Sequence, residues 1–268
     1  YLDTIPKFQD KGASASNFEL ENITEFCELM GNPQKQFPSI HVAGTNGKGT
    51  TCYLLEAVYQ KAGYKTGLFT SPHLIRYNER FRINGKEVDD ELILEFFQRF
   101  SKELKQIALT YFEICTALSF WLFAEEKVDL AIIETGLGGR LDSTNIINPE
   151  LSIITSIGLD HQDILGNTEE AIAKEKAGII KKSKPVILGN ISEENEAVIS
   201  EIALRNYAQI FKAKDLNPIW DKKSFIIEKK SLYIDTQLLE EVNKWNIASV
   251  YLATKVIKNL FPVSNKDF

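Results

Sequence analysis

A glycine-rich stretch at residues 41–51, HVAGTNGKGTT, constrains the fold of this chain more than any other feature. An apolar run over residues 39–43 leads into it, and a helical pattern with Cys52, Leu55 and Val58 on one side follows at once. Strand, glycine loop, lysine, hydroxyl residues and helix together indicate a phosphate-binding loop, in which backbone N–H groups and the positive helix end surround the phosphates. Lys48 would reach the outer phosphates, and Thr50 or Thr51 would ligate Mg²⁺.

The stretch departs from the common phosphate-loop pattern at two positions. Val42 stands where a glycine usually precedes the Gly-Lys pair, and Gly49 stands where Ser or Thr usually follows the lysine. The alternative is a plain glycine-rich turn from strand to helix. The lysine and the two threonines nevertheless stand where phosphate and metal need them, which favours the phosphate loop.

Composition limits the class of protein. With 268 residues and 44% hydrophobic residues, the chain can form one large domain or two small ones. A net charge of −6 argues against a general nucleic-acid surface, and no apolar run approaches a membrane span. The cysteines Cys27, Cys52 and Cys115 are scattered, which predicts neither a disulfide framework nor a zinc site. We expect a cytoplasmic monomer that acts on small molecules and binds neither nucleic acid nor membrane.

Near-continuous apolar runs separated by helical patterns predict an α/β fold with a mostly parallel sheet flanked by helices. Strands are expected at residues 39–43, 65–70, 128–134, 151–157 and 185–188. Helices are expected at residues 20–30, 89–104, 111–126, 169–180 and 238–260. One hairpin turns at Asn84-Gly85, and a small antiparallel hairpin covers residues 224–234.

Polar residues cluster after four of the predicted strands, at residues 44–51, 71–73, 134–142 and 160–161. In open parallel sheets ligands bind at this edge. Glu134 ends a buried strand, where a carboxylate is placed to hold Mg²⁺, although a solvated strand-end acid is the alternative. His161 is a candidate second metal ligand, whereas His41 lies inside a strand and is interpreted as structural. For Lys176, near a helix end, the pattern alone favours a solvated lysine.

Six motifs in fixed order make the chain resemble the folylpolyglutamate synthase/dihydrofolate synthase family of the Mur ligase superfamily. The motifs are GTNGKGT at 44–50, SPHL at 71–74, TYFE at 110–113, ETGLGGRLDSTN at 134–145, TSIGLDH at 155–161 and KEKAGI at 174–179. The resemblance covers nearly the whole chain, and a glycine after the loop lysine is the pattern of this family.

The resemblance implies an ATP-dependent carboxylate–amine ligase of folate biosynthesis, which adds L-glutamate to dihydropteroate, to folates or to both through an acyl phosphate. The cofactors it implies are ATP and Mg²⁺ at two sites, with Lys48, Lys176 and His161 as the catalytic residues. The implied ATP-binding residues are Gly44, Thr45, Asn46, Gly47, Lys48, Gly49, Thr50, Thr51 and, on the adenine side, Asn246. The implied metal ligands are Ser71, Glu134, His161 and Lys176, the last as a carbamate formed with CO₂. The implied pterin-binding residues are Thr110, Phe112, Asp142 and Ser143.

Members of that family continue into a smaller α/β domain that closes over ATP. We therefore expect residues 1–262 to form the ATP-binding domain and residues 263–268 to begin a linker to a C-terminal domain. Two other functions stay open: a peptidoglycan-precursor ligase, against which the motif at 110–113 speaks, and a phosphate-loop kinase or binding module. A kinase would have no use for a carbamate on Lys176, so this residue discriminates between the classes.

Overall fold

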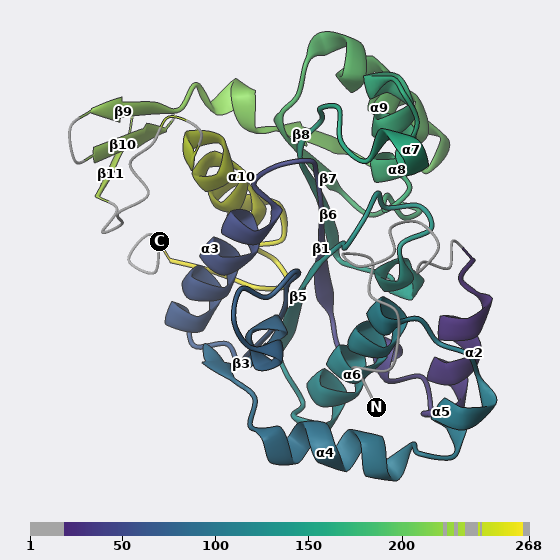
Figure 1. The fold of residues 1–268 in the computed structure, drawn as a ribbon. Coiled ribbons are helices and arrows are strands. Elements are labelled where there is room, and N and C mark those ends of the chain that lie inside the picture. The colour runs from purple at the N-terminus through teal and green to yellow at the C-terminus, as the bar shows by residue number, and fades with distance from the viewer. Residues whose placement is uncertain (1–18, 222–223, 228–229, 234–240, 242, 265–268) are drawn as a thin grey trace.

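The computed structural model describes residues 19–221, 224–227, 230–233, 241 and 243–264. Its centre is an eight-stranded sheet with the strand order β4-β3-β2-β5-β1-β6-β7-β8 (Figure 1). The strands are β1 (Ser39–Ala43), β2 (Thr66–Phe69), β3 (Phe81–Ile83), β4 (Lys86–Glu87), β5 (Leu130–Glu134), β6 (Leu151–Ser156), β7 (Val186–Asn190) and β8 (Ile210–Lys212). All neighbours from β2 to β8 pair parallel, whereas β3 and β4 add an antiparallel hairpin at one edge. The predicted, mostly parallel α/β fold is confirmed.

Helices cover both faces of this sheet. They are α2 (Glu21–Leu29), α3 (Lys48–Lys61), α4 (Asp90–Arg99), α5 (Glu103–Gln106), α6 (Tyr111–Glu125), α7 (Gln162–Leu165), α8 (Glu169–Ala177), α9 (Glu193–Arg205) and α10 (Asn243–Val256). Short 3₁₀ helices are η3 (Pro33–Lys35), η4 (Tyr77–Arg80), η5 (Ser143–Ile146) and η6 (Ala213–Leu216). In Figure 1, α3 and α10 lie on one side of the sheet, and α2, α6 and α8 lie on the other.

The alternation of side chains along the strands explains why both faces are covered. On β1 and β5, Val42 and Ile132 belong to the apolar cluster that includes α3 and α10. Ala131 and Ile133, which flank Ile132 on β5, point the other way, into the cluster around α6. Because successive strand residues face opposite sides, strands that are apolar throughout need a helical layer on each face.

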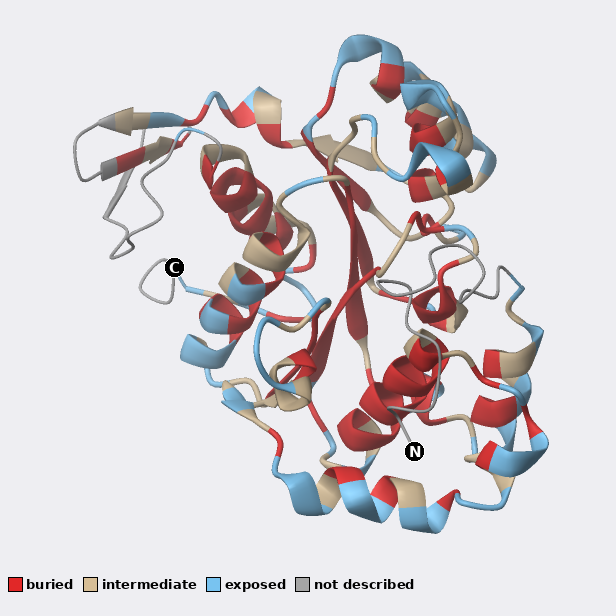
Figure 2. Cartoon of the chain, in the orientation of Figure 1, coloured by how far each residue is buried: buried red, intermediate tan, exposed pale blue. Residues whose placement is uncertain are grey.

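Helix α6 is buried almost all round, and Figure 2 shows it in red along most of its length. Its sequence is apolar on every side, as expected for a helix enclosed by other elements. The ring of its Trp121 packs against Phe96 and Phe100, and these two pack against Phe26. Across the described part of the chain, no helix is both long and apolar enough to cross a membrane.

The predicted hairpin near the end of the chain is part of a separate three-stranded antiparallel sheet. Its strands are β9 (Ile219–Asp221), β10 (Ser224–Ile227) and β11 (Lys230–Tyr233), in the order β11-β10-β9. The rings of Phe225 and Trp220 are tilted by 59° with centroids 4.8 Å apart, and Phe225 shares an apolar cluster with Ile247 and Tyr251 of α10. The expected turn at residues 229–230 lies partly outside the described residues.

The single helix predicted over residues 89–104 is wrong. Helix α4 ends at Arg99, and α5 begins only at Glu103. Phe100 leaves the helical conformation, with φ −106° and ψ 21°, while its ring packs into the aromatic cluster, so tertiary packing overrides the local pattern. Asp89 occupies the N-cap position of α4 but makes no side-chain capping bond. Helix α9 and strand β8 lie outside the predicted elements, and the first residues of the helix predicted at 238–260 fall outside the described ones.

Candidate functional site

The register of the central strands brings four polar segments to one edge of the sheet. Strand β1 lies between β5 and β6, with Val42 beside Glu134 and Ala43 beside Ile154. Strand β2 follows on the far side of β5, with Phe69 beside Ile133. The carboxyl ends of β2, β5, β1 and β6 are therefore level, and the loop after β1 begins between the loops after β5 and β6. In an open parallel sheet, such a point is the expected place for a ligand.

Hydroxyl groups at the end of β6 hold the glycine-rich loop after β1. Thr155 Oγ1 donates to the carbonyl of Asn46 at 2.6 Å, and Ser156 Oγ accepts from the Asn46 N–H at 2.9 Å. Gly44 has φ +156°, and a Cβ there would lie 1.9 Å from Thr155 Oγ1, so only glycine allows this contact. Thr155 and Ser156 were not among the site residues predicted from the sequence. The available signal was two hydroxyl residues that end an otherwise apolar strand.

Asn246 of α10 lies directly against the same loop. Gly47 is the N-cap of α3 with φ +83°, and a Cβ there would lie 2.5 Å from Asn246 Oδ1. The hydroxyl of Thr51, which is fully buried, donates to Asn246 Oδ1 at 3.4 Å. Asn246 thus supports the loop from the far end of the chain, and Thr51 is engaged in this support while Thr50 stays half-buried.

Glu134 is a buried carboxylate at the centre of this edge, with only 4% of its surface exposed. The backbone N–H of Ser71 donates to Glu134 Oε2 at 3.1 Å. Burial raises the pKa of Glu134 to about 7, although the nearby charge of Lys48 and the Ser71 hydrogen bond oppose this shift. Lys48 itself donates to the carbonyl of Gly44 at 3.0 Å. A carboxylate in this surrounding is stabilised by any further cation that reaches it.

Lys176 is buried in the last turn of α8, with 2% of its surface exposed. The interpretation as a solvated lysine is therefore wrong. Burial, and after it the charge of Lys48, lowers the pKa of Lys176 to about 8, while the charges of Asp160 and Asp142 act in the opposite direction. A sizeable fraction of neutral amine near neutral pH makes this lysine a potential nucleophile.

Close packing of the turn after β5 on the end of α8 places this lysine at the sheet edge. A Cβ on Gly139 would lie 2.7 Å from the carbonyl oxygen of Glu175, so the two backbones touch. Asn145 fastens the contact, because its Nδ2 donates to the carbonyls of Arg140 at 2.9 Å and Gly178 at 3.1 Å. Asn145 was not singled out from the sequence, since nothing in the pattern shows which backbones it bridges.

Two of the predicted pterin-binding residues lie at the start of α6. Thr110 is the N-cap: its Oγ1 accepts from the Glu113 N–H at 3.3 Å and donates to Glu113 Oε2 at 2.8 Å. Phe112 is half-buried, and its ring lies against Gly136, where a Cβ would be 2.4 Å from Phe112 Cζ. The ring therefore borders the turn after β5.

Asp142 and Ser143, the other two, lie at the end of that turn. Asp142 accepts from the Leu137 N–H at 2.8 Å and from the Thr144 N–H at 3.0 Å, and burial raises its pKa. The hydroxyl of Ser143 lies 2.8 Å from that of Thr116 on α6. Asp142 thus caps the turn, and a pterin contact of these residues stays a prediction.

His161 and His41 differ sharply in exposure. His161 is exposed at the N-cap of α7, with its Nε2 3.6 Å from Asp160 Oδ1. His41 is fully buried in β1, as the structural interpretation expected. Among the described residues, no three His, Cys, Asp or Glu side chains gather into a metal-binding group.

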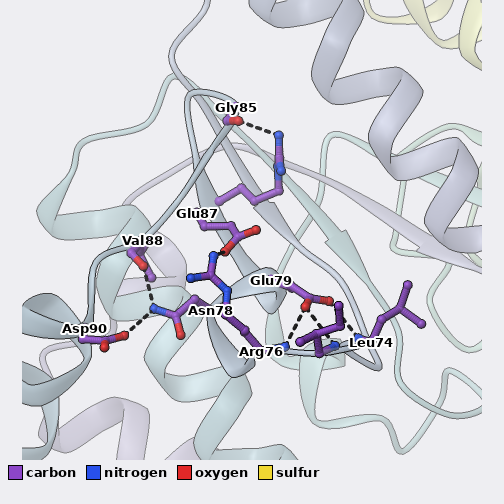
Figure 3. A network of polar contacts seen from close by, with 10 residues as sticks. Leu74, Arg76, Asn78, Glu79, Gly85, Glu87, Val88 and Asp90 are labelled. Carbon is purple, nitrogen blue, oxygen red and sulfur yellow. Dashed lines mark hydrogen bonds and ion pairs between the residues drawn. The ribbon is translucent and has the colours of Figure 1, made fainter.

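The loop after Ser71 is braced by a single carboxylate. Glu79 accepts from the backbone N–H groups of Leu74 at 2.7 Å, Ile75 at 2.9 Å and Arg76 at 2.6 Å (Figure 3). Arg76 also pairs with Glu87 of β4. These contacts link the loop to η4 and β4 although Leu74 and Ile75 are 91% and 87% exposed.

Comparison with known proteins identifies the family. The family model described as "Mur ligase middle domain" matches residues 42–259, which is most of the chain. The chain therefore belongs to the Mur ligase family. Within it, similar proteins include folylpolyglutamate and dihydrofolate synthases. The dihydrofolate synthase/folylpolyglutamate synthase of Escherichia coli is 47% identical over 60% of this chain, and that of Bacillus subtilis is 41% identical over 88%.

Solved structures agree with this placement. The structure titled "FPGS-AMPPCP complex" matches all of this chain with a TM-score of 0.87 and 30% identity. The structure titled "E.coli FolC in complex with DHPP and ADP" matches all of it with a TM-score of 0.86 and 34% identity. The chain spans 68% and 62% of these two structures, and 38% and 59% of the E. coli and B. subtilis proteins.

Proposed function

We propose that this chain forms the ATP site of a ligase that adds L-glutamate to dihydropteroate, to folates or to both. The observation that carries the proposal is Lys176, a buried lysine of lowered pKa that shares the sheet edge with Lys48 and Glu134. A phosphate-loop kinase has no use for such a group. Support also comes from the similar proteins, whose solved structures include complexes with AMPPCP and folate and with DHPP and ADP.

The reaction suits a site built from positioned charges. An oxygen of the substrate carboxylate attacks the γ-phosphorus of ATP, ADP leaves, and an acyl phosphate forms. The amine of L-glutamate then attacks the acyl carbon and loses a proton, and the tetrahedral intermediate collapses to an amide and phosphate. The loop N–H groups, the N-terminus of α3 and Lys48 would stabilise the negative charge during phosphoryl transfer. No covalent intermediate with the protein is needed.

The residues at the edge fit a divalent cation. Glu134 is buried, burial raises its pKa, and none of the described residues forms an ion pair with it. Mg²⁺ prefers one or two carboxylates together with phosphate oxygens and water, so a site without three acidic groups suits it. We propose that Ser71, Glu134 and His161 hold Mg²⁺, with Thr50 on the phosphate side. When bound, the ion supplies positive charge to the phosphates.

Lys176 would complete a second cation site as a carbamate. Its neutral amine attacks the carbon of CO₂, the N–C bond forms, and the nitrogen loses a proton. With a pKa of about 8, roughly a tenth of the amine is neutral at pH 7, against under a thousandth for an ordinary lysine. Burial of the side chain thus prepares it for carbamate formation. The two oxygens of the carbamate would take the place of a carboxylate ligand.

The pterin would bind between the start of α6 and the turn after β5. The half-buried ring of Phe112 gives a flat apolar surface beside that turn, and the carboxylate of Asp142 suits a heterocycle edged with N–H groups. Thr110 and Ser143 would complete the pocket. Dihydrofolate synthesis would then be at least one of the activities.

The test measures ADP release and product mass for the full-length protein with L-glutamate, with dihydropteroate and tetrahydrofolate compared as acceptors. Phe112→Ala is expected to raise KM for dihydropteroate and leave KM for ATP unchanged. Phe97→Ala is the matched control, because Phe97 is also a partly buried aromatic residue but lies on α4. Absence of acceptor-dependent ADP release, or unchanged dihydropteroate kinetics in Phe112→Ala, would contradict the proposal.

A further inference from the structure

A line of three buried side chains connects strand β1 with the carboxylate of Asp142. His41 Nε2 lies 2.8 Å from Thr144 Oγ1, and the same Thr144 hydroxyl donates to Asp142 Oδ1. His41 and Thr144 are fully buried, and Asp142 is 6% exposed. The contact from His41 to Thr144 spans 103 residues of sequence, so it exists only in the folded chain.

With Asp142 ionised, the hydrogen atoms in this line have one consistent arrangement. An ionised carboxylate only accepts hydrogen bonds, so Thr144 gives its single hydroxyl hydrogen to Asp142. Thr144 must then accept from His41, which requires the tautomer with its proton on Nε2. His41 Nδ1 has no hydrogen-bond partner among the described residues, as expected for the unprotonated nitrogen. Burial, and after it the charge of Lys181, lowers the pKa of His41 to about 3, so the imidazole is neutral.

The line ends on a carboxylate whose orientation matters for the site. Thr144 contacts Asp142 Oδ1 twice, through its backbone N–H and its hydroxyl. The other oxygen, Oδ2, accepts from the backbone N–H of Leu137 in the glycine turn. Two bonds on Oδ1 prevent rotation of the carboxylate and leave the lone pairs of Oδ2 toward the turn. The Thr144 hydroxyl that contacts Oδ1 is the one that meets His41.

We propose that His41 is a positioning residue for Asp142: its Nε2–H holds the Thr144 hydroxyl on Oδ1, so that Oδ2 is presented to the N–H groups of a flat heterocyclic substrate. The identity of that substrate rests on the proposed function, whereas the line of hydrogen bonds does not. His41 touches no substrate and acts only through Thr144.

Kinetics of the full-length protein test the positioning role. His41→Phe and Thr144→Val are each expected to raise KM for dihydropteroate about 3- to 10-fold, the loss of one buried hydrogen bond, with KM for ATP unchanged. Thr144→Ser keeps the hydroxyl and should restore wild-type KM. The double variant should be no worse than either single variant, because both break the same line.

Ser152→Ala is the matched control. Ser152 pairs with His41 in the register of β1 and β6, is fully buried, and donates to the carbonyl of Ile179 at 2.9 Å. Its loss removes a buried hydrogen bond at the same depth of the sheet but outside the line to Asp142. A lower Tm with unchanged KM is expected for this variant. If His41→Phe behaves like Ser152→Ala, the positioning role is refuted.

A direct measurement separates this inference from the proposed function. ¹⁵N NMR of the wild-type protein should show His41 as the neutral tautomer protonated on Nε2, and Thr144→Val should shift that nitrogen signal. A proton on Nδ1, or no response to Thr144→Val, would overturn the line of hydrogen bonds. If the NMR result is as expected but dihydropteroate does not bind to any form of the protein, the proposed substrate fails and the line stands.

Discussion

The carboxyl edge of the sheet and the aromatic cluster around α6 use burial for opposite purposes. Around α6, the rings of Phe26, Phe96 and Trp121 are buried against other apolar groups, which stabilises the fold. At the sheet edge, Glu134 and Lys176 are buried just as deeply, and burial shifts the pKa of each toward its neutral form. Free energy gained in one region offsets the cost of buried ionisable groups in the other. Such costs are typical of functional sites.

The largest expected effect is a loss of activity at the sheet edge that leaves the stability of the fold unchanged. Lys48→Ala should lower ATP turnover at least ~10³-fold, because it removes the positive charge that stabilises the phosphoryl group during its transfer. The Tm should change little, since Lys48 contributes one hydrogen bond to Gly44 and is only half-buried. Steady-state ADP release and thermal unfolding check both parts. Near wild-type turnover would contradict the assignment of the glycine-rich loop as a phosphate-binding loop.

The next largest effect is a loss of stability in the aromatic cluster around α6. Phe96→Ala should lower the free energy of unfolding by about 3–5 kcal/mol, because it opens a cavity among packed aromatic rings. Leu94→Ala is the control on the same helix, since Leu94 is 57% exposed, and it should have little effect. Urea unfolding at pH 7 measures the free energy of unfolding of both variants. Equal effects of both variants would show that α4 does not belong to the core as described.

Replacing the buried carboxylate of Glu134 at the sheet edge should stabilise the protein. Because the folded-state pKa of Glu134, about 7, is above its ordinary value of 4.5, the folded protein binds this proton more tightly than the unfolded chain. Stability from this group is present below pH 4.5 and is lost as the pH rises through 7. In EDTA and without nucleotide at pH 8, Glu134→Gln should therefore be more stable than wild type by about 1–3 kcal/mol.

The pH dependence gives the decisive readout for Glu134→Gln. Its advantage in urea unfolding should shrink steadily from pH 8 to pH 5, while its ADP release should be lost. Glu→Gln keeps the size of the side chain, so packing stays constant. An advantage that does not depend on pH would mean that the titration of Glu134 is not its source.

The smallest expected effects are changes in stability on replacing two lysines of α8, one buried and one exposed. Lys176→Met should stabilise the protein at pH 7 by about 1–2 kcal/mol, because a folded-state pKa of about 8, below the ordinary 10.5, makes the charged form costly. That gain should fade as the pH rises from 8 toward 10.5. Lys174→Ala, which removes an exposed pair with Glu170, should leave Tm nearly unchanged. Destabilisation by Lys176→Met at pH 7 would contradict the burial cost.

Local sequence predicted much of this molecule because the signals are short. The glycine loop, the apolar strands and Glu134 at a strand end each depend on a few neighbouring residues, and the parallel sheet follows from their order. The helix predicted over 89–104 failed where Phe100 turned into the core. The pattern alone also favoured a solvated Lys176, because a helical pattern does not show that the turn after β5 covers this residue, and only the family resemblance placed it in the site.

What the sequence alone determined is the parallel α/β sheet, the glycine-rich loop between β1 and α3 and the edge at which polar groups gather, since each is encoded within one or two adjacent elements. The tertiary structure alone decided which distant groups meet at that edge. Asn246 lies against Gly47 and Thr51, and the contact between Thr51 and Asn246 spans 195 residues of sequence. His41 reaches Asp142 through Thr144, and the contact between His41 and Thr144 spans 103 residues. Burial, and with it the pKa of Glu134 and Lys176, depends on this packing and on no local pattern.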